Sequence, residues 1–150
     1  MVADVRIKDN SVQVRKSLLR LSKKVPQIVK KALSNAVAFQ VASIKKRTTE
    51  KGVDFRGRAF KPYSKNYKRR LVKQSGVVDL KDTGQMFSSL SSKVTPSKGE
   101  LFFLRKTEND KAFFHDVVGV GKSRVIRPFF RISKKEETNI EKIFFNVLER

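Results

Sequence analysis

The stretch "PQIVKKALSNAVAFQVASIKKRTTEK", from Pro26 to Lys51, decides the fold. Its apolar side chains recur at three- and four-residue steps, which is the spacing of one face of an α-helix. Pro26 is tolerated best in a first helical turn, and Gly52 suits the position just after a helix end. The longest helix is therefore predicted from Pro26 to about Lys51, with this apolar face: Ile28, Val29, Ala32, Leu33, Ala36, Val37, Val41 and Ile44.

The residues before Pro26 predict two further elements. In "VADVRIKD", Val5 and Ile7 alternate with basic residues, as in a short strand. Asn10 or Ser11 then caps a first helix that ends or restarts at Pro26. Its apolar side consists of Val14, Leu18, Leu19 and Leu21.

The middle of the chain predicts turns and two short helices. Gly57 marks a turn in "DFRGRAF". Ser64 caps a short basic helix that carries Tyr67, Leu71 and Val72. Asp82 with Gln85 three residues later predicts a capping box, before an apolar side made of Met86, Phe87 and Leu90.

The C-terminal third predicts a hairpin, two helices and a strand. In "SSKVTPSKGELFFLRK", two strands flank a turn at Pro96 to Gly99. A short helix through His115 leads into a glycine-marked loop. "IRPFFRIS" predicts a strand that lies at a sheet edge or starts at Pro128, because proline cannot donate to a sheet ladder. Ser133 and Glu136 predict a second capping box, and the final helix carries Ile140, Ile143, Phe144, Val147 and Leu148.

These elements predict one α+β domain over residues 1–150. A small antiparallel sheet would pack against the long central helix, together with N- and C-terminal helices. The chain is 39% hydrophobic, which is enough for a core. It has no cysteine, no apolar run long enough to span a membrane, and no signal-peptide pattern at its start. We therefore expect no membrane partner and synthesis in the cytoplasm.

Charge is the strongest compositional signal. Thirty-five Lys and Arg against fourteen Asp and Glu give a formal net charge of +21. Such a chain attracts nucleic acid or an acidic protein surface, although charge runs also coat solvated faces. Phe60, Tyr63 and Tyr67 lie among basic residues, where they could stack on bases. No helix-turn-helix, zinc-finger or RNP-type signature argues for sequence readout. The residues expected to face DNA or an acidic partner are Arg15, Lys16, Arg20, Lys23, Lys24, Lys65, Lys68, Arg69, Arg70 and Lys73.

Catalytic and metal-binding patterns are weak. His115 is the single histidine, and its neighbour Asp116 does not by itself make a catalytic pair. No histidine–carboxylate cluster or EF-hand spacing predicts a metal site, and no cofactor is expected. "GVGKS" at Gly119 to Ser123 lacks the leading glycine of a phosphate-binding loop, so it predicts a glycine loop with a basic tip. The sequence favours a protein that is not an enzyme. A small nuclease is the third of three function hypotheses, after the two given below.

Four short motifs follow one another along the chain. Arg47 and Thr48 precede a D-x-x-G-x-x-F-x-P-Y-S segment, which holds Asp54, Gly57, Phe60, Pro62, Tyr63 and Ser64. An L-x-x-T-G-x-M-x-x-S-L segment holds Leu80, Thr83, Gly84, Met86, Ser89 and Leu90. Ala112 and His115 form A-x-x-H, and an R-P-F motif follows at Arg127, Pro128 and Phe129. In this order they resemble the phage virion morphogenesis proteins, the tail-completion or neck proteins of long-tailed bacteriophages.

The resemblance covers about Ile44 to Ser133, with three departures. Asp116 stands where a glutamine is expected, Arg131 where a glycine is common, and the loop from Val117 to Arg124 is unusual. These departures leave the role of that loop open.

The resemblance implies a non-enzymatic subunit of a ring at the head–tail junction of the virion. The ring, hexameric or matched to a twelvefold connector, would join the head connector to the tail terminator or tail tube and let DNA pass. It would assemble in the host cytoplasm. A non-sequence-specific nucleic-acid-binding protein is the alternative. The expected subunit-interface or loop-anchor residues are Arg47, Phe60, Pro62, Tyr63, Thr83, Met86, His115, Arg127, Pro128 and Phe129.

Specific roles follow for some of these residues. Phe129 or Phe130 is expected to be buried, because phenylalanines at this spacing usually pack. Arg127 would hold a neighbouring loop or subunit. Tyr63 would hydrogen-bond across a loop, and Thr83 or Asp82 would cap a helix.

Overall fold

The computed structural model describes residues 11–70 and 77–149. It confirms the α+β prediction: a long helix, a two-stranded antiparallel sheet and a C-terminal helix form one domain. The strand predicted in "VADVRIKD" lies outside the described residues, as do Leu71 and Val72 of the short basic helix.

One uninterrupted helix, α1, spans Ser11–Lys45 and passes into a π-helical turn, η1, at Lys46–Glu50. The predicted break at Pro26 is therefore wrong, because Pro26 lies inside α1. Proline removes only one helical hydrogen bond, the one to the carbonyl of Ser22. Both Ser22 and Val25 are exposed, so water can satisfy that carbonyl. The predicted helix end is confirmed by Gly52, which has a left-handed φ of 63°.

Two short helices follow. Ser64 caps α2 (Lys65–Lys68) as predicted, since its hydroxyl accepts the Tyr67 N–H. The capping box predicted at Asp82 is wrong, because α3 (Gln85–Ser88) has Gly84 as its N-cap, at a φ of 77°. At the start of this helix, the side chain of Thr83 accepts instead: its Oγ1 lies 3.5 Å from the Gln85 nitrogen.

The predicted hairpin is confirmed. Strands β1 (Leu90–Val94) and β2 (Gly99–Phe103) pair antiparallel, with Leu90 opposite Phe103. The sheet packs closely on α1: a Cβ added at Gly99 would lie 2.5 Å from Val37 Cγ2. A side chain at Gly99 would force Val37 to move, so glycine lets the start of β2 lie close to the helix.

Helix α4 (Lys106–Phe113) continues into a second π-helical turn, η2 (Phe114–Val118). The strand predicted in "IRPFFRIS" is wrong, since residues 126–133 carry no strand. The backbone N–H groups of this segment donate to acceptors outside the sheet. The Arg127 N–H goes to the His115 carbonyl, the Phe130 N–H goes to the Asp116 carboxylate, and Pro128 has none.

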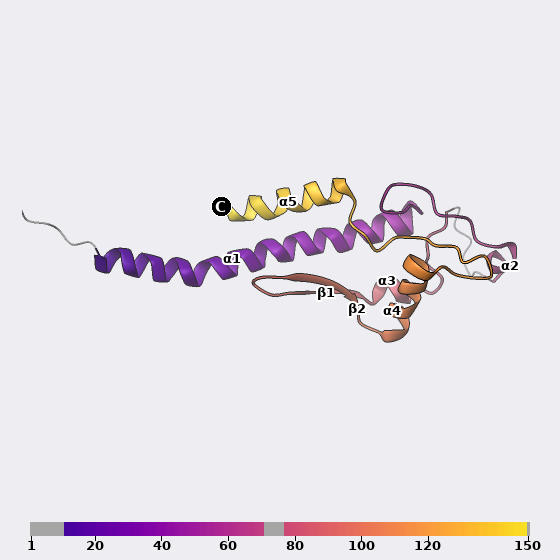
Figure 1. Cartoon of the computed structure of the whole chain (residues 1–150), viewed down its shortest axis with the longest axis horizontal. Coiled ribbons are helices and arrows are strands. Elements are labelled where there is room, and N and C mark those ends of the chain that lie inside the picture. The colour runs from indigo at the N-terminus through magenta and orange to yellow at the C-terminus, as the bar shows by residue number, and fades with distance from the viewer. Residues whose placement is uncertain (1–10, 71–76, 150) are drawn as a thin grey trace, which may run out of the picture.

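The final helix, α5 (Lys134–Leu148), begins at the predicted Ser133–Glu136 capping box. Figure 1 shows α5 lying antiparallel along α1, with the hairpin on another side of the same helix. The hydrophobic core lies toward the C-terminal end of α1, and Phe129 is fully buried in it. Burying one phenylalanine contributes roughly 1.5–3 kcal/mol.

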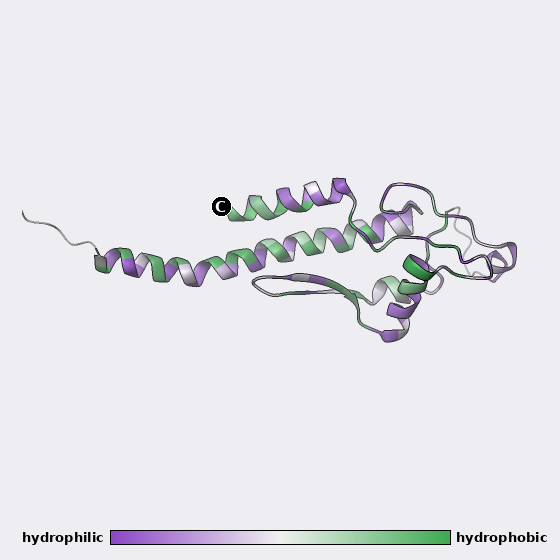
Figure 2. Ribbon diagram, in the orientation of Figure 1, coloured by the Kyte–Doolittle hydropathy of each residue, from purple (hydrophilic) through white to green (hydrophobic). Residues whose placement is uncertain are grey.

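The first half of α1 extends beyond this core. Figure 2 shows hydrophobic residues continuing along this uncovered stretch. The side chains predicted to be the apolar side of a first helix, Val14, Leu18, Leu19 and Leu21, are more than half exposed. The predicted N-terminal helix is thus a projection of the central one.

Candidate functional site

Arg47 joins three separate segments of the chain. It lies in η1 and is 8% exposed. Its guanidinium donates to the Glu136 carboxylate, to the Phe129 carbonyl at 2.7 Å and to the Arg131 carbonyl. One side chain therefore ties η1 to the start of α5 and to the extended segment that precedes α5.

The partner carboxylate, Glu136, has further contacts. Its second oxygen accepts the Ser133 N–H at 2.9 Å and lies 3.5 Å from Gln40 Nε2. Burial alone would raise the pKa of Glu136, but the hydrogen bond from Ser133 and the charge of Arg47 outweigh it and hold the pKa below its ordinary value. Glu136 is thus ionised and paired at neutral pH.

Arg127 holds the Pro–Tyr–Ser loop, as predicted for a loop anchor within one chain. Its Nε donates to the Lys61 carbonyl at 3.1 Å, and its Nη2 donates to the Pro62 carbonyl at 3.3 Å. The guanidinium carbon lies 5.1 Å from the centre of the Tyr63 ring. Burial lowers the pKa of Arg127, but an arginine stays charged at neutral pH.

Tyr63 makes the predicted hydrogen bond across a loop. Its hydroxyl accepts the Leu80 N–H at 3.0 Å. Leu80 is buried at a left-handed φ of 52°, a conformation that costs a non-glycine residue roughly 1–3 kcal/mol. Burial raises the pKa of Tyr63 to about 12, so the phenol keeps its proton. The hydroxyl therefore anchors a strained segment.

His115 is not paired with Asp116. The Asp116 carboxylate accepts the Phe130 N–H at 2.8 Å, and its other oxygen lies 3.9 Å from Arg131 Nε. Burial, with the positive charge of Arg127, lowers the pKa of His115 to about 4, so its imidazole is neutral at pH 7. Its Nδ1 is buried without a hydrogen-bond partner in the described structure.

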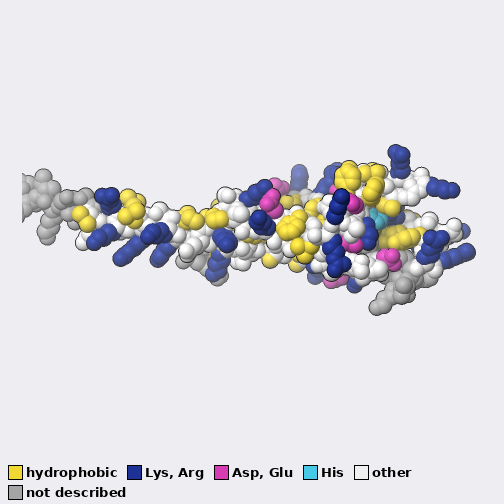
Figure 3. Space-filling view, turned by 90° about the horizontal axis from the view of Figure 1, so that it is seen from below, with side chains coloured by type: hydrophobic (Ala, Val, Ile, Leu, Met, Phe, Trp, Pro, Cys, Tyr) yellow, Lys and Arg dark blue, Asp and Glu magenta, His cyan; other side chains and the backbone are white. Residues whose placement is uncertain are grey.

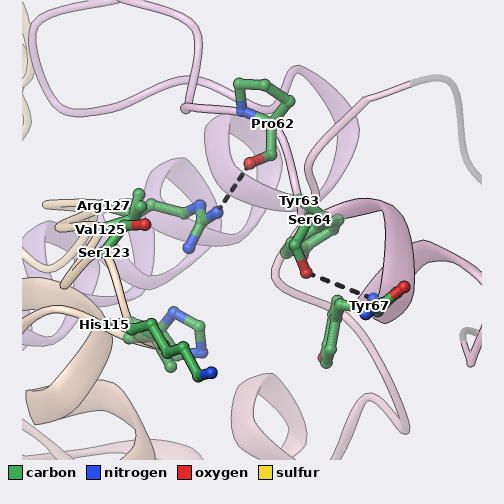
Figure 4. A pocket seen from close by; sticks show the side chains of 12 residues that line it. Pro62, Tyr63, Ser64, Tyr67, His115, Ser123, Val125 and Arg127 are labelled. Atoms are coloured by element: carbon green, nitrogen blue, oxygen red, sulfur yellow. Dashed lines mark hydrogen bonds between the residues drawn. The ribbon is translucent and has the colours of Figure 1, made fainter.

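A cavity of about 430 Å³ brings three of the motifs together. Figure 4 shows Tyr63, Tyr67, His115 and Arg127 around it. The loop Val120 to Ser123 supplies another wall. Arg47 and Phe129 do not line this cavity but are joined to each other by a hydrogen bond. We call Arg47, Tyr63, His115, Arg127 and Phe129 together the motif junction.

The remaining predicted anchors fall in different places. Phe60 and Met86 are core residues, each 7% exposed. Thr83 is exposed and lines a neighbouring cavity of about 280 Å³, which shares Tyr63, Tyr67 and His115 with the first. Pro128 is partly buried between two junction residues.

The glycine loop is a tight turn. Val120 and Val125 form an antiparallel bridge, and the Arg124 N–H donates to the Gly121 carbonyl at 3.0 Å. The next helix, α5, begins ten residues after the loop ends at Arg124, at Lys134. The "GVGKS" segment therefore lacks the helix N-terminus on which a phosphate-binding loop depends.

The predicted basic residues form two separate groups. One group follows the exposed first half of α1, and the other lies at and after α2, at the opposite end of the molecule (Figure 1). Lys73 lies outside the described residues. The stacking prediction is wrong for Phe60, which is buried, whereas Tyr67 is 39% exposed. These groups do not make one continuous stripe.

Sequence reasoning missed several partners. Glu136 was predicted only as a helix cap, and Asp116 only as a departure from a motif. Arg47 and Glu136 are 89 residues apart, so no local pattern could pair them. Among the residues that the structure describes, no three His, Cys, Asp or Glu side chains group as metal ligands would, and no helix could cross a membrane.

No protein-family model, curated protein or solved structure matches the chain.

Proposed function

We propose that this protein is a ring-forming adaptor at the head–tail junction of a bacteriophage virion. It would join the head connector to the tail terminator or tail tube and let DNA pass through its lumen. The motifs that resemble the phage virion morphogenesis family are the starting point. The proposal gives them a structural role and no catalytic one.

The motif junction is the observation that carries the proposal. Motif residues distant in sequence contact one another: Arg47 bonds the Phe129 carbonyl, and Arg127 bonds the Pro62 carbonyl. The other two motifs are joined to them by the Leu80 N–H, which donates to the Tyr63 hydroxyl, and by the Arg127 N–H, which donates to the His115 carbonyl. The bonds run mostly to backbone carbonyls, which fixes loop positions as an assembly surface requires.

The charge supports an assembly that includes other components. A ring of subunits each near +21 repels itself, so an acidic partner or DNA is needed to compensate. We expect the isolated subunit to be a monomer or weakly associated in moderate salt. The ring would form on the connector.

A nucleic-acid-binding protein is the second candidate. The first half of α1 is exposed and contains no Asp or Glu, which favours this candidate. Phosphate contacts without base readout would make affinity fall steeply with salt and depend little on sequence.

Gene disruption separates the two candidates. In the phage or prophage that carries the gene, the adaptor proposal predicts head, connector and tail genes alongside. A nonsense mutation should then leave DNA-filled heads and separate tails in electron micrographs. Normally joined virions from the mutant would refute the adaptor role.

A further inference from the structure

The first half of α1 carries a row of apolar side chains that nothing in the described chain covers. We call residues 12–28 the arm. Val14, Leu18, Leu21, Val25 and Ile28 are spaced four, three, four and three residues apart. Their exposed fractions run from 39% at Ile28 to 61% at Leu18. In Figure 1 the arm projects past the end of α5 and the tip of the hairpin.

The spacing of this row is that of a helix-packing seam. Alternate steps of three and four average 3.5 residues, the period at which apolar residues meet a partner helix in coiled coils. The next step of four residues from Ile28 reaches Ala32, which is fully buried in the domain. The row is therefore continuous with the face of α1 that the rest of the chain already covers.

The charge of the arm restricts what could cover the row. Figure 3 shows Lys and Arg side chains interleaved with hydrophobic ones along it. From Ser11 to Thr49 the sequence contains no Asp or Glu. Two arms packed together would bring like charges close, which disfavours a second copy. Nucleic acid would neutralise the charge but would leave the apolar row in water.

We propose that the arm is the docking site for an amphipathic helix of an acidic partner protein. The apolar side chains of that helix would recur with the 3.5-residue period, and Asp or Glu would flank them. Such a helix covers the row and neutralises the basic residues beside it. The inference rests on the proposed function for the identity of the partner, an acidic component of the virion junction, but the arm is tested without it.

The heptad positions show which side chains the partner touches. With Leu18 and Val25 at the first position of the heptad, Lys24 lies beside the row. Lys23 lies on the far side of the helix. Leu19 is also off the row, although it is 53% exposed and adjacent to Leu18. Leu19 and Lys23 are therefore matched controls for Leu18 and Lys24.

The experiment measures binding of a designed peptide to the full chain by fluorescence anisotropy. The probe is a four-heptad helix with leucine and isoleucine at its seam and glutamate at both flanking positions. A second peptide has lysine at the flanks. We expect saturable binding of the acidic peptide and none of the basic one. Leu18→Gln with Leu21→Gln should weaken binding roughly a hundredfold, because two seam leucines are lost.

The controls fix the interpretation. Leu19→Gln should change the affinity less than about twofold, and Lys24→Gln should weaken binding more than Lys23→Gln does. Circular dichroism should show unchanged helix content, since all five of these side chains are exposed in the free protein.

Three results would overturn the proposal. They are no saturable binding of the acidic peptide, an equal loss in Leu19→Gln, and a dimer of the isolated protein that the Leu18 and Leu21 changes abolish. The last would assign the arm to a second copy. Failure of the peptide test would leave ring formation on the connector unaffected. Conversely, loss of the adaptor role would leave the peptide result standing.

Discussion

Replacing Arg47 by methionine tests the motif junction most sharply. Methionine keeps much of the apolar stem but leaves the Glu136 carboxylate without its cation. It also leaves the carbonyls of Phe129 and Arg131 without their donor. Both charged side chains are largely buried, with exposed fractions of 10% and 12%. Breaking one partner of such a pair costs roughly 3–5 kcal/mol, most of it from the unpaired charge.

Urea unfolding followed by circular dichroism at pH 7 measures this loss. For a chain of this length the same change would lower the melting temperature by roughly 6–20 °C. Arg58→Met is the matched control, because Arg58 also pairs with a carboxylate, Asp54 at 3.1 Å, but is 64% exposed. We expect that variant to lose less than about 1 kcal/mol. Equal losses in the two variants, or a loss below about 1 kcal/mol in Arg47→Met, would refute the reasoning.

Three further predictions concern single side chains. The lowered pKa of Glu136 means that its contribution to stability is present above its unfolded pKa and is lost as pH falls through the folded pKa. The difference in unfolding free energy between wild type and Glu136→Gln should therefore be larger at pH 7 than at pH 3, and a constant difference would contradict this. Phe129→Ala should destabilise by roughly 3–5 kcal/mol in urea titrations because Phe129 is fully buried, whereas Phe114→Ala, 50% exposed, should cost much less. Gly119→Ala should lower the free energy of unfolding by roughly 2 kcal/mol or more, since its Cβ would lie 2.3 Å from the Arg124 carbonyl oxygen. Gly121→Ala has open space around it and should lower the free energy of unfolding by only about 1 kcal/mol. Thermal melts in which Gly121→Ala is the less stable variant would contradict this prediction.

Local signals in the sequence predicted much of the fold. The Ser133–Glu136 capping box, the hairpin turn before Gly99 and the helix end at Gly52 each depend on a few neighbouring residues. Such features are decided by short-range backbone chemistry, so they can be read without knowing the tertiary structure.

The failures have a common physical cause, which is that tertiary contacts and solvent override local preference. Pro26 looked like a boundary, but an exposed helix tolerates the lost bond. Residues 126–133 looked like a strand, but the Phe130 N–H donates to the Asp116 carboxylate and the Arg127 N–H donates to the His115 carbonyl. A β-ladder would need both of these N–H groups.

The sequence named several residues of the motif junction as anchors, but it did not predict all of their partners. Arg127 and Tyr63 were expected to anchor loops, and they do. The partner of Arg47 was not foreseen, because Glu136 already had a sufficient local role as a helix cap. The exposed arm was also missed, since an apolar helix face is ordinarily expected to be buried.

Mass photometry of the purified protein, with and without its candidate connector across a salt series, tests the adaptor role most directly. We predict a monomer alone and a sixfold or twelvefold ring with the connector, insensitive to added DNA. A stable ring in moderate salt without a partner would contradict the proposed role of charge. A monomer that ignores the connector and binds any DNA, with affinity falling steeply as salt rises, would contradict the adaptor function itself.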